Sequence, residues 1–483
     1  MKLRPYQQEA VNAIFSSWQE NQRTLLVLPT GCGKTIVFAS VVDRIVKGLP
    51  GLSRVLILAH RDELLDQAQN KLQLVTGIVA AREKGKFTIT SNELVDISSW
   101  QTMDRRLKRF KPNCFDYIIV DEAHHIMSKG YQRIVNHFRS AKVLGVTATP
   151  ERMDNLDLMD YFDDLAYQYT IRQAMEEGYL SRARVQTCPI NIDIRQVHTK
   201  MGDYDTNEVA DAIQPYFARI IAEMNKYADK RKIVVFLPLV RISQEFCAMC
   251  NHVGFRAAEI NGNSKDRKEI LAAFEAGEYD VLCNSMLLTE GWDCPSVDCV
   301  VILRPTKSRG LYQQMVGRGL RLAPNKHNCL ILDFLWLERK HSLCRPYDLL
   351  GVSEDVAEKM DDAIKQGAEL DLMDAEEQAK KDVQAEREAA IQRKLEQTKH
   401  REAQSYDPLT GQPTNRPTQD NTPTVKQRYA LSALGFRNID QWTKQDAWQI
   451  MRLWHSKWVD KNPDRLAMAL HCNPAEYIPE SMG

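Results

Sequence analysis

Residues 29–35 of this 483-residue chain, Pro-Thr-Gly-Cys-Gly-Lys-Thr, have the composition of a phosphate-binding loop. They follow the apolar run 25–28 and precede a helix-like segment. A loop between a strand and a helix presents backbone N–H groups and the positive end of the helix dipole to an anion. The string therefore predicts a site for the phosphates of a nucleotide.

Each residue type in this loop has a role in such a site. Gly31 and Gly33 would let the backbone approach the phosphates closely, Lys34 would reach the β- and γ-phosphates, and Thr35 would bind Mg²⁺. Leu28 stands where the full pattern has a glycine, and short strings of this kind also occur by chance. The loop alone is therefore a moderate indication of ATP binding.

A pair of acidic residues strengthens this indication. Asp121 and Glu122 directly follow the apolar run 117–120, and ligand-binding groups of open α/β sheets lie at the carboxyl ends of strands. Asp121 would hold the metal, and Glu122 would orient and deprotonate the attacking water. The alternative, two acids that only cap the next helix, is disfavoured because the phosphate loop also follows a strand.

The elements that must position these residues are those of an α/β protein. From about residue 24 to 333, short β-branched runs alternate with longer amphipathic segments. Several runs are almost wholly apolar, which is typical of parallel strands covered on both faces by helices. We expect strands at residues 25–28, 55–58, 117–120, 143–146, 233–236, 281–283, 300–303 and 330–332. The stretch suffices for two domains, 1–180 and 181–345, with a seam between Gly178 and Arg231.

With both sites placed, further strings follow in an order that resembles the DEAH-box helicases and translocases of superfamily 2, over about residues 1–340. The strings are residues 3–7 (LRPYQ), 58–64 (LAHRDEL), 98–102 (SSWQT), 147–150 (TATP), 233–238 (IVVFLP), 289–293 (TEGWD) and 314–321 (QMVGRGLR). This family tolerates a residue other than glycine at the position of Leu28. The resemblance implies two tandem RecA-like domains with parallel sheets, to which the later sequence adds an α-helical C-terminal extension.

The resemblance also implies which residues act. Catalytic roles fall on Lys34, Asp121, Glu122, Gln314, Arg318 and Arg321. Contacts to ATP fall on Arg4, Gln7 (which would read adenine), Thr30, Gly31, Cys32, Gly33, Lys34, Thr35, Gly291 and Asp293. Mg²⁺ would be bound by Thr35 and Asp121, and the nucleic-acid backbone by Arg61, Gln101, Thr102 and Thr289. Gln314 and His124 would link the two domains, whereas a nucleic-acid contact and a packing role are equally open for His60 and Trp100.

The two arginines near residue 320 also support this interpretation physically. Arg318 and Arg321 are three residues apart, so on a helix they share a face and can point at one phosphate group. An arginine supplied across a cleft neutralises charge that develops during phosphoryl transfer, an effect of about 10³–10⁵ in rate in other NTPases. ATP would therefore lie between the two domains.

The charge balance limits the kinds of partner. The chain has 64 Lys+Arg and 64 Asp+Glu, which excludes a generally basic, histone-like binder and an acidic disordered chain. The resulting net charge of zero is a sum of unlike parts, because residues 1–350 carry a net charge of +5 and residues 351–405 carry −6. A mildly basic motor suits a protein that must release its nucleic acid at each step, because every neutralised phosphate adds affinity.

The composition indicates a protein without membrane spans or disulfides. No signal peptide is visible at the N-terminus, and the longest apolar runs are far shorter than the ~18 residues that a membrane span requires. The eleven cysteines are scattered, which favours reduced thiols in a cytosol. We expect a soluble protein of the cytoplasm, in a bacterial cell or a phage-infected host.

The chain changes character after about residue 345. Residues 346–405 read as an acidic helical arm, which begins with one amphipathic helix and continues as a solvated helix or partly disordered segment after Gly367. Residues 406–424 are rich in Pro, Thr, Asn and Gln and read as a linker. Residues 425–483 hold four of the eight tryptophans and read as a small helical module.

Two interpretations of the tryptophans in this module stay open. Trp454 and Trp458, with basic neighbours, could stack on bases, but we expect them to form a small three-helix core. Docking of a protein partner through residues 351–483 is equally open.

The leading hypothesis is an ATP-dependent DNA helicase or translocase that works in repair, recombination or replication restart, on single-stranded, forked or branched DNA. The alternatives are an RNA helicase, because the motor strings do not separate the two sugars, and a nucleic-acid-sensing ATPase or restriction-type motor subunit that acts through a partner. The chain looks similar to bacterial RadD-like and phage UvsW-like helicases, yet it lacks the cysteine-rich C-terminal finger expected of a RadD-like protein. Cys247 and Cys250 favour core packing, because no second cysteine pair lies at zinc spacing.

Overall fold

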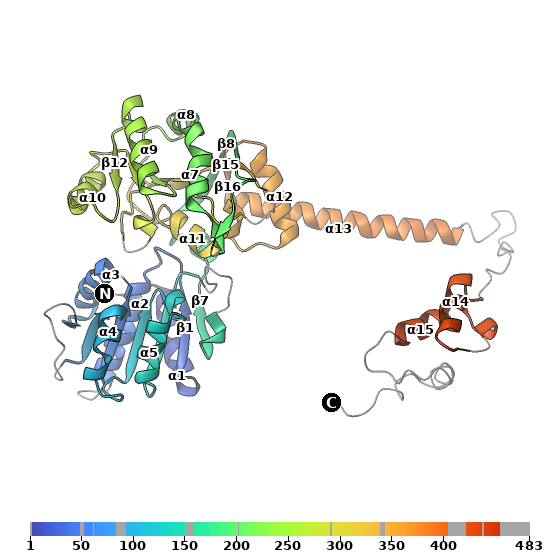
Figure 1. Cartoon of the computed structure of the whole chain (residues 1–483), viewed down its shortest axis with the longest axis horizontal. Coiled ribbons are helices and arrows are strands. Elements are labelled where there is room, and N and C mark those ends of the chain that lie inside the picture. Colours follow the sequence, from blue (N-terminus) through green and yellow to red (C-terminus); the bar gives the residue numbers. More distant parts are fainter. Residues whose placement is uncertain are drawn as a thin grey trace. The chain divides into compact units, whose positions relative to one another are not determined.

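The computed structural model divides the chain into two compact units, residues 1–385 and 386–483 (Figure 1). It describes residues 2–48, 53–60, 62–83, 93–149, 158–200, 202–289, 292–338, 343–403, 422–436 and 439–454. The first unit contains two seven-stranded sheets. We call the sheet formed by β1 to β7, with its helices, lobe 1, and the sheet that begins with β8, with its helices, lobe 2. No helix in these described ranges has the length and apolar character that a membrane crossing requires.

The sheet of lobe 1 is wholly parallel, with the strand order β3-β4-β2-β5-β6-β1-β7. Its central strands are almost wholly buried, and β2 (VLILA) is a continuous apolar run, as parallel strands under helices require. The strands are β1 (Arg23–Val27), β2 (Val55–Ala59), β3 (Ala81–Glu83), β4 (Val95–Ser99), β5 (Tyr117–Asp121), β6 (Lys142–Thr147) and β7 (Asp164–Gln168). The helices are α1 (Pro5–Glu20), α2 (Lys34–Gly48), α3 (Asp62–Thr76), α4 (Trp100–Arg106), α5 (Lys129–His137) and α6 (Ile171–Glu176).

The sheet of lobe 2 has the order β12-β13-β11-β14-β15-β8-β16 and is parallel except for the short edge strand β16. The strands are β8 (Arg182–Asp193), β11 (Ile233–Phe236), β12 (Ala257–Ile260), β13 (Val281–Asn284), β14 (Cys299–Ile302), β15 (Asn328–Leu337) and β16 (Leu370–Asp371), and β9 (Thr199–Lys200) and β10 (Asp203–Tyr204) form a separate pair. The helices are α7 (Thr206–Ile213), α8 (Phe217–Tyr227), α9 (Val240–Val253), α10 (Arg267–Ala276), α11 (Arg309–Gly317), α12 (Glu354–Lys365) and α13 (Leu372–Ala403).

Short 3₁₀ turns complete the elements. They are η1 (Leu107–Arg109), η2 (Ala123–His125), η3 (Leu158–Asp160), η4 (Gln214–Tyr216), η5 (Leu287–Thr289), η6 (Pro346–Leu349) and, in the second unit, η7 (Ile439–Gln441). One cluster of buried side chains continues from lobe 1 into lobe 2. The two lobes therefore share part of their hydrophobic core.

All eight expected strand runs are strands, and the tandem parallel sheets confirm the expected fold class. The structure adds six strands to these two sheets, of which β8 is the longest. In its C-terminal half β8 alternates buried and exposed residues, so it lacks the continuous apolar run by which the other strands were predicted. Strand β8 lies inside the region between Gly178 and Arg231, which the sequence analysis predicted to be a seam between the domains. The connection between α6 and β8 is therefore shorter than that seam. Cys247 and Cys250 are buried on α9 in the core of lobe 2.

The first part of the acidic arm belongs to the compact first unit. Val356, Met360 and Ile364 lie on one face of α12, as the sequence predicted, and all three are buried. The acids that follow pair with basic residues near the interlobe connection: Glu369 with Arg184, Asp371 with Arg182, and Glu376 with Arg172. The sequence pattern could not show this because the charges have their partners about 190 residues earlier in the chain.

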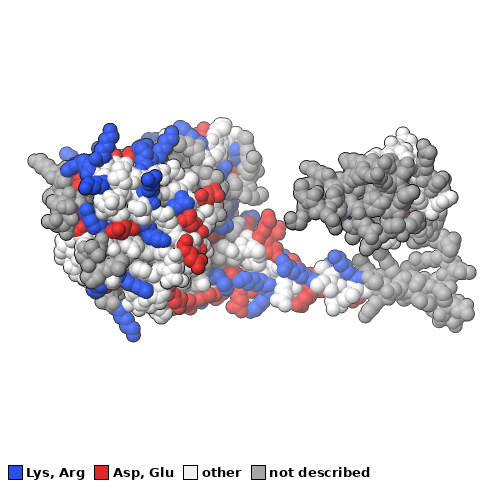
Figure 2. Space-filling view, turned by 90° about the horizontal axis from the view of Figure 1, so that it is seen from below, with Lys and Arg blue, Asp and Glu red and all other residues white. Residues whose placement is uncertain are grey.

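The rest of α13 has the features of a solvated helix. Its side chains from Ala385 to Glu396 are exposed, and Lys, Arg, Asp and Glu alternate along the exposed helix (Figure 2). Neighbouring charges of opposite sign stabilise such a helix by a few tenths of a kcal/mol per pair. This part therefore agrees with the expected solvated helix.

The second unit contains a small core of its own. Helices α14 (Val425–Ala433) and α15 (Lys444–Trp454) bury Leu431, Phe436 and Ile450. Trp442 and Trp454 pack against Phe436, with ring centroids 5.6 and 5.5 Å apart. Trp454 therefore has the core role that the sequence favoured, whereas Trp458 lies outside the described residues.

The burial of α12 predicts a stability effect. Met360→Ala removes a side chain that is fully buried, and we expect it to lower the free energy of unfolding by about 2–5 kcal/mol. Asp362→Ala, on the exposed face of the same helix, should change it by less than about 0.5 kcal/mol. Chemical denaturation of the full chain measures both. Equal, small effects would contradict the packing of α12 on lobe 2.

Candidate active site

The phosphate-loop string forms the connection between β1 and α2. Gly31 and Gly33 have positive φ angles of 92° and 77°, a conformation that favours glycine. Lys34 is the first residue of α2 and Thr35 the second, so the loop surrounds a helix N-terminus. Cys32 is buried within the loop, and burial raises the pKa of its thiol to about 12. The thiol therefore stays protonated and contributes no charge to the site.

The acidic pair lies at the carboxyl end of β5. Strand β6 lies between β5 and β1, so the acids and the phosphate loop lie on either side of the residues that follow β6. Glu122 has a left-handed backbone conformation with φ 50°, and its N–H donates to Asp121 Oδ1 at 3.0 Å. Such sparsely populated conformations cluster at functional sites. Lys34 Nζ lies 3.1 Å from Glu122 Oε1, and both side chains are almost buried.

Two arginines of lobe 2 face these groups. Arg318 and Arg321 follow α11, and both donate to the carbonyl oxygen of Trp292. Arg321 is also ion-paired with Asp293. Burial lowers the pKa of Arg321 from its ordinary value, and the Asp293 carboxylate opposes this shift. An arginine stays charged at neutral pH in such surroundings, so lobe 2 presents fixed positive charge to the cleft.

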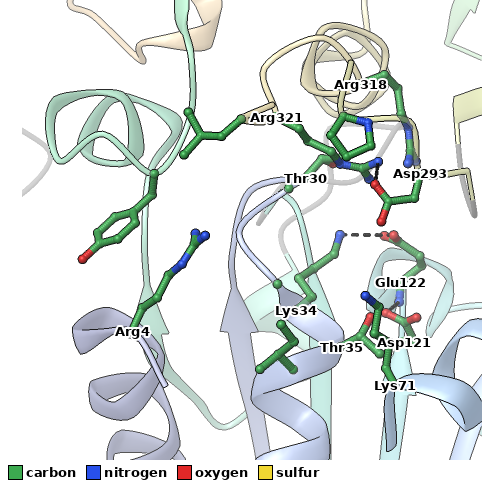
Figure 3. A pocket seen from close by; sticks show the side chains of 16 residues that line it. Arg4, Thr30, Lys34, Thr35, Lys71, Asp121, Glu122, Asp293, Arg318 and Arg321 are labelled. Carbon is green, nitrogen blue, oxygen red and sulfur yellow. Dashed lines mark hydrogen bonds and ion pairs between the residues drawn. The ribbon is translucent and has the colours of Figure 1, made fainter. Parts of the chain in front are cut away.

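Residues of both lobes line one cavity of about 270 Å³ (Figure 3). The residues that the sequence assigned to this site and that line the cavity are Arg4, Thr30, Gly31, Gly33, Lys34, Thr35, Asp121, Glu122, Asp293, Arg318 and Arg321. Among them are the loop, the acidic pair and both arginines, and Thr30 and Arg321 are 291 residues apart in the sequence. The cavity therefore collects the groups that phosphoryl transfer requires: cations, a candidate base and oxygen ligands for a metal.

The lobes approach each other most closely at glycines. A Cβ atom on Gly31 would lie 2.9 Å from Arg321 Cγ, and a Cβ atom on Gly317 would lie 2.9 Å from the Cβ of Thr30. Real Cβ atoms do not come this close to another carbon atom. The cleft can therefore close to this extent only with glycine at both positions.

Three of the assigned residues lie behind the cavity lining. Gln7 is buried, and its Nε2 donates to the Cys32 carbonyl at 3.2 Å. Gln314 is buried on α11. Gln7 and Cys32 thus support the phosphate loop from the side of α1, whereas Gly291 lies outside the described residues.

The four assigned nucleic-acid residues are described only in part. Gln101 and Thr102 lie in the first turn of α4, where Ser99 Oγ accepts from the Thr102 N–H at 3.3 Å. Arg61 lies outside the described residues, and Thr289 is described only in its backbone.

Five residues of the lining were missed by sequence reasoning. They are Ile36, Lys71, Tyr179, Pro295 and Leu322. Lys71, on α3, adds a cation to the side that holds Thr35 and Asp121. The Arg4 guanidinium lies 5.0 Å from the centre of the Tyr179 ring. Neither Lys71 nor Tyr179 belongs to one of the recognised strings, and only the fold brings them to the cleft.

Comparison with known proteins matches both lobes. Residues 1–152 match the family model described as the res subunit of type III restriction enzymes, and residues 216–323 match the helicase conserved C-terminal domain. The chain is 31% identical over 386 residues to IRC3 of Saccharomyces cerevisiae, which is named as an ATP-dependent helicase; the match covers 75% of this chain and 55% of IRC3. It is 25% identical over 372 residues to the DNA 3'-5' translocase XPB2 of Sulfurisphaera tokodaii, with 66% of this chain and 79% of that protein covered.

A solved structure supports the same assignment. The chain superposes, with a TM-score of 0.56 and 26% identity, on a fragment assigned as the HsdR subunit of a type I restriction enzyme of Vibrio vulnificus; 69% of this chain and 64% of that chain are covered. The two family models together cover more than half of the chain. The chain belongs to the superfamily 2 helicases. It spans little more than half the length of its yeast relative.

The glycine contact between the lobes predicts a loss of activity without unfolding. Gly317→Ala places a methyl group against Thr30 and should hold the arginines away from the phosphate loop. We expect the ATPase kcat to fall about 10- to 100-fold, because misplacement by about 1 Å has effects of this size. The melting temperature should not fall, since alanine favours a helix over glycine.

The matched control for this variant is Gly262→Ala, where a Cβ atom would meet open space. Its kcat should equal that of the native chain. Full activity of Gly317→Ala would refute the close approach of the lobes.

Proposed function

We propose that the chain is an ATP-dependent DNA helicase or translocase, which couples ATP hydrolysis between lobes 1 and 2 to movement along DNA or to its remodelling. The observation that carries the proposal is the cavity in which Lys34 and Glu122 of lobe 1 face Arg318 and Arg321 of lobe 2. Hydrolysis in such a site depends on the separation of the lobes, so each ATP cycle can open and close the protein.

Lobe 1 would bind the nucleotide. The phosphate loop from Thr30 to Gly33 would bind the phosphates through backbone N–H groups, and Lys34 would contact the β- and γ-phosphates. Glu122 would accept the proton of the attacking water. The adenine would lie near Gln7, where the Arg4 guanidinium or the Tyr179 ring, which both line the cavity, can stack on its face.

The donor set fits Mg²⁺. Thr35 supplies a hydroxyl and Asp121 a carboxylate in the same cavity, and Mg²⁺ is commonly bound by one or two such groups together with phosphates and water. When bound, the ion would neutralise the phosphate oxygens. Thr35 and Asp121 would hold it, and removal of the ion with EDTA should abolish hydrolysis.

Lobe 2 would complete the site. Arg318 and Arg321 would neutralise charge that develops on the transferred phosphoryl group. Gly291 and Asp293 would contact the nucleotide from this side, and Gln314 would help to link the two lobes. Because the arginines come from the second lobe, they act only while the cleft is closed.

Several observations favour DNA as the polymer. XPB2, named as a DNA translocase, matches this chain over most of its own length, and restriction-enzyme subunits match both in sequence and in structure. Arg61, Gln101, Thr102 and Thr289 would contact the backbone of the strand, which gives weak sequence preference. We expect action on single-stranded, forked or branched DNA in repair, recombination or replication restart, in the cytoplasm of a bacterial cell or infected host.

The proposed domains follow the sequence boundaries. Residues 1–180 and 181–345 would be the two RecA-like domains, 346–405 the arm, 406–424 a linker and 425–483 the C-terminal module. A RadD-like or UvsW-like place within the superfamily is part of the same proposal.

A second candidate function is a motor subunit that works through a protein partner docked on residues 351–483. It is favoured by the second unit, in which Tyr429 is 80% and Trp448 56% exposed. They are the only exposed large aromatic residues in the described part of the chain. A purified chain that hydrolyses ATP on DNA but neither moves along it nor separates strands would favour this candidate.

The first test concerns the catalytic roles. Glu122→Gln should lower the kcat of ATP hydrolysis about 10²- to 10⁴-fold, because it removes the general base, and should still bind a fluorescent ATP analogue. Lys34→Ala should lose both binding and hydrolysis. A Glu122→Gln protein that hydrolyses ATP normally would overturn the assignment of the site.

The second test identifies the polymer. ATP hydrolysis is measured without polymer and then with single-stranded DNA, forked DNA, branched DNA and RNA. We expect stimulation by DNA, and the affinity should fall steeply with salt because phosphate contacts release counterions. Stimulation by RNA alone would establish the RNA-helicase alternative instead.

A further inference from the structure

Aromatic rings form a continuous stack inside lobe 1, away from the nucleotide cavity. His60 follows β2, His125 lies in η2 after β5, and Trp100 begins α4. The His60 and His125 rings are stacked at 4.4 Å with planes 21° apart. The His60 and Trp100 rings are 6.5 Å apart and nearly parallel. We call these three residues the imidazole–indole stack.

One end of the stack reaches the candidate catalytic base. The rings of His125 and His124 are 4.1 Å apart, and His124 Nδ1 lies 3.5 Å from Glu122 Oε2. Both histidines follow Glu122 within three residues, in the short turn η2. A shift of the His125 ring is therefore transmitted to the segment that holds the Glu122 carboxylate.

The other end of the stack reaches the proposed nucleic-acid contacts. Trp100 shares the first turn of α4 with Gln101 and Thr102, and Ser99 caps this turn. Trp100 Nε1 donates to His60 Nδ1 at 3.2 Å, which requires His60 to accept at that nitrogen. Arg61, a third proposed contact, follows His60 directly. Movement of this turn on binding a strand would therefore move the indole against His60.

The indole has little room to move without pushing its neighbours. A Cβ atom on Gly130 would lie 2.2 Å from Trp100 Cζ3, so the ring lies flat against the start of α5. On the same helix, the Tyr131 ring stacks at 5.6 Å from the Trp100 ring. Close-packed side chains of this kind transmit displacement instead of absorbing it.

We propose that the imidazole–indole stack couples nucleic-acid binding at the first turn of α4 to the position of Glu122. Trp100, His60 and His125 are positioning residues, because none of them lines the nucleotide cavity. The proposal rests on the proposed function, since it assigns the route by which the polymer stimulates hydrolysis. Because Glu122 lines the nucleotide cavity, its position also affects nucleotide binding, and linkage then makes bound nucleotide change the affinity for the polymer by the same factor.

The test compares Trp100→Leu with Trp100→Phe in the full chain. For each variant, kcat and KM for ATP are measured without polymer and at saturating single-stranded DNA. The Kd for fluorescent single-stranded DNA is measured with and without a non-hydrolysable ATP analogue. Phe110→Leu is the matched control, because Phe110 packs only against Phe115 and Phe138 among the ring contacts of the described chain.

For Trp100→Leu we expect the stimulation of kcat by DNA to fall about 2- to 30-fold, the range of single residues that modulate coupling. The effect of the ATP analogue on the Kd for DNA should fall by a similar factor. Basal kcat and the Kd without nucleotide should stay within about twofold of the native values. Trp100→Phe, which keeps a ring against Gly130, should restore most of the stimulation, and Phe110→Leu should behave as the native chain.

The outcomes separate this proposal from the proposed function. A native chain that no polymer stimulates would overturn both. Normal stimulation in a folded Trp100→Leu protein would overturn the coupling role alone, and so would a loss of DNA affinity without nucleotide, since Trp100 would then be a binding residue. If Trp100→Leu does not fold, His125→Leu carries the same expectations. When both single variants fold, the double variant with Trp100→Leu and His125→Leu should lose no more stimulation than either single change, because both residues act in one unit.

Discussion

The closeness of the two lobes at the phosphate loop is the constraint on which the site depends. Gly31 faces Arg321 and Gly317 faces Thr30, so backbone meets side chain with no room for a methyl group at either place. Gly310 of α11 similarly approaches Thr149, which follows β6. The contacts at Gly31 and Gly317 thus limit how closely lobe 2 can approach the phosphate loop of lobe 1. The arginines reach the cavity because lobe 2 comes this close to the phosphate loop.

Much of the fold and of the site was predictable because two signals in the sequence are local. Strands such as β2 and β11 are continuous apolar runs between polar segments, and the phosphate loop and acidic pair each occupy a few consecutive residues. Strand β8 was not predicted because it alternates exposed and buried residues in its C-terminal half. Lys71 and Tyr179 were not predicted as site residues. Lys71 reaches the cavity through the packing of α3, and Tyr179 reaches it through the interlobe connection. No local sequence pattern indicates either arrangement.

The acidic arm changes the meaning of the charge balance. Arg172, Arg182 and Arg184 would count as basic surface near the interlobe connection, yet each is paired with an acid from residues 369–376. Glu376 is almost fully buried and is paired with both Arg172 and Lys380, so removing both partners would leave an unfavourable charge. The net positive charge of residues 1–350 therefore overstates what the lobes can offer to a polyanion. Binding of a polyanion must therefore depend on individual residues at defined positions and not on the net charge of the lobes.

The ion pair between Lys34 and Glu122 neutralises two of the charges that line the cavity. Both charges are nearly removed from water, and each is the other's counter-ion. Under the proposed function, an incoming γ-phosphate would compete with the carboxylate for the ammonium group, and it would leave Glu122 without that partner when a water must be activated. Binding of the substrate would thus release the Glu122 carboxylate from Lys34, and the carboxylate could then act as the base. Under the proposed function, Glu122 would stay paired with Lys34 until the γ-phosphate takes its place.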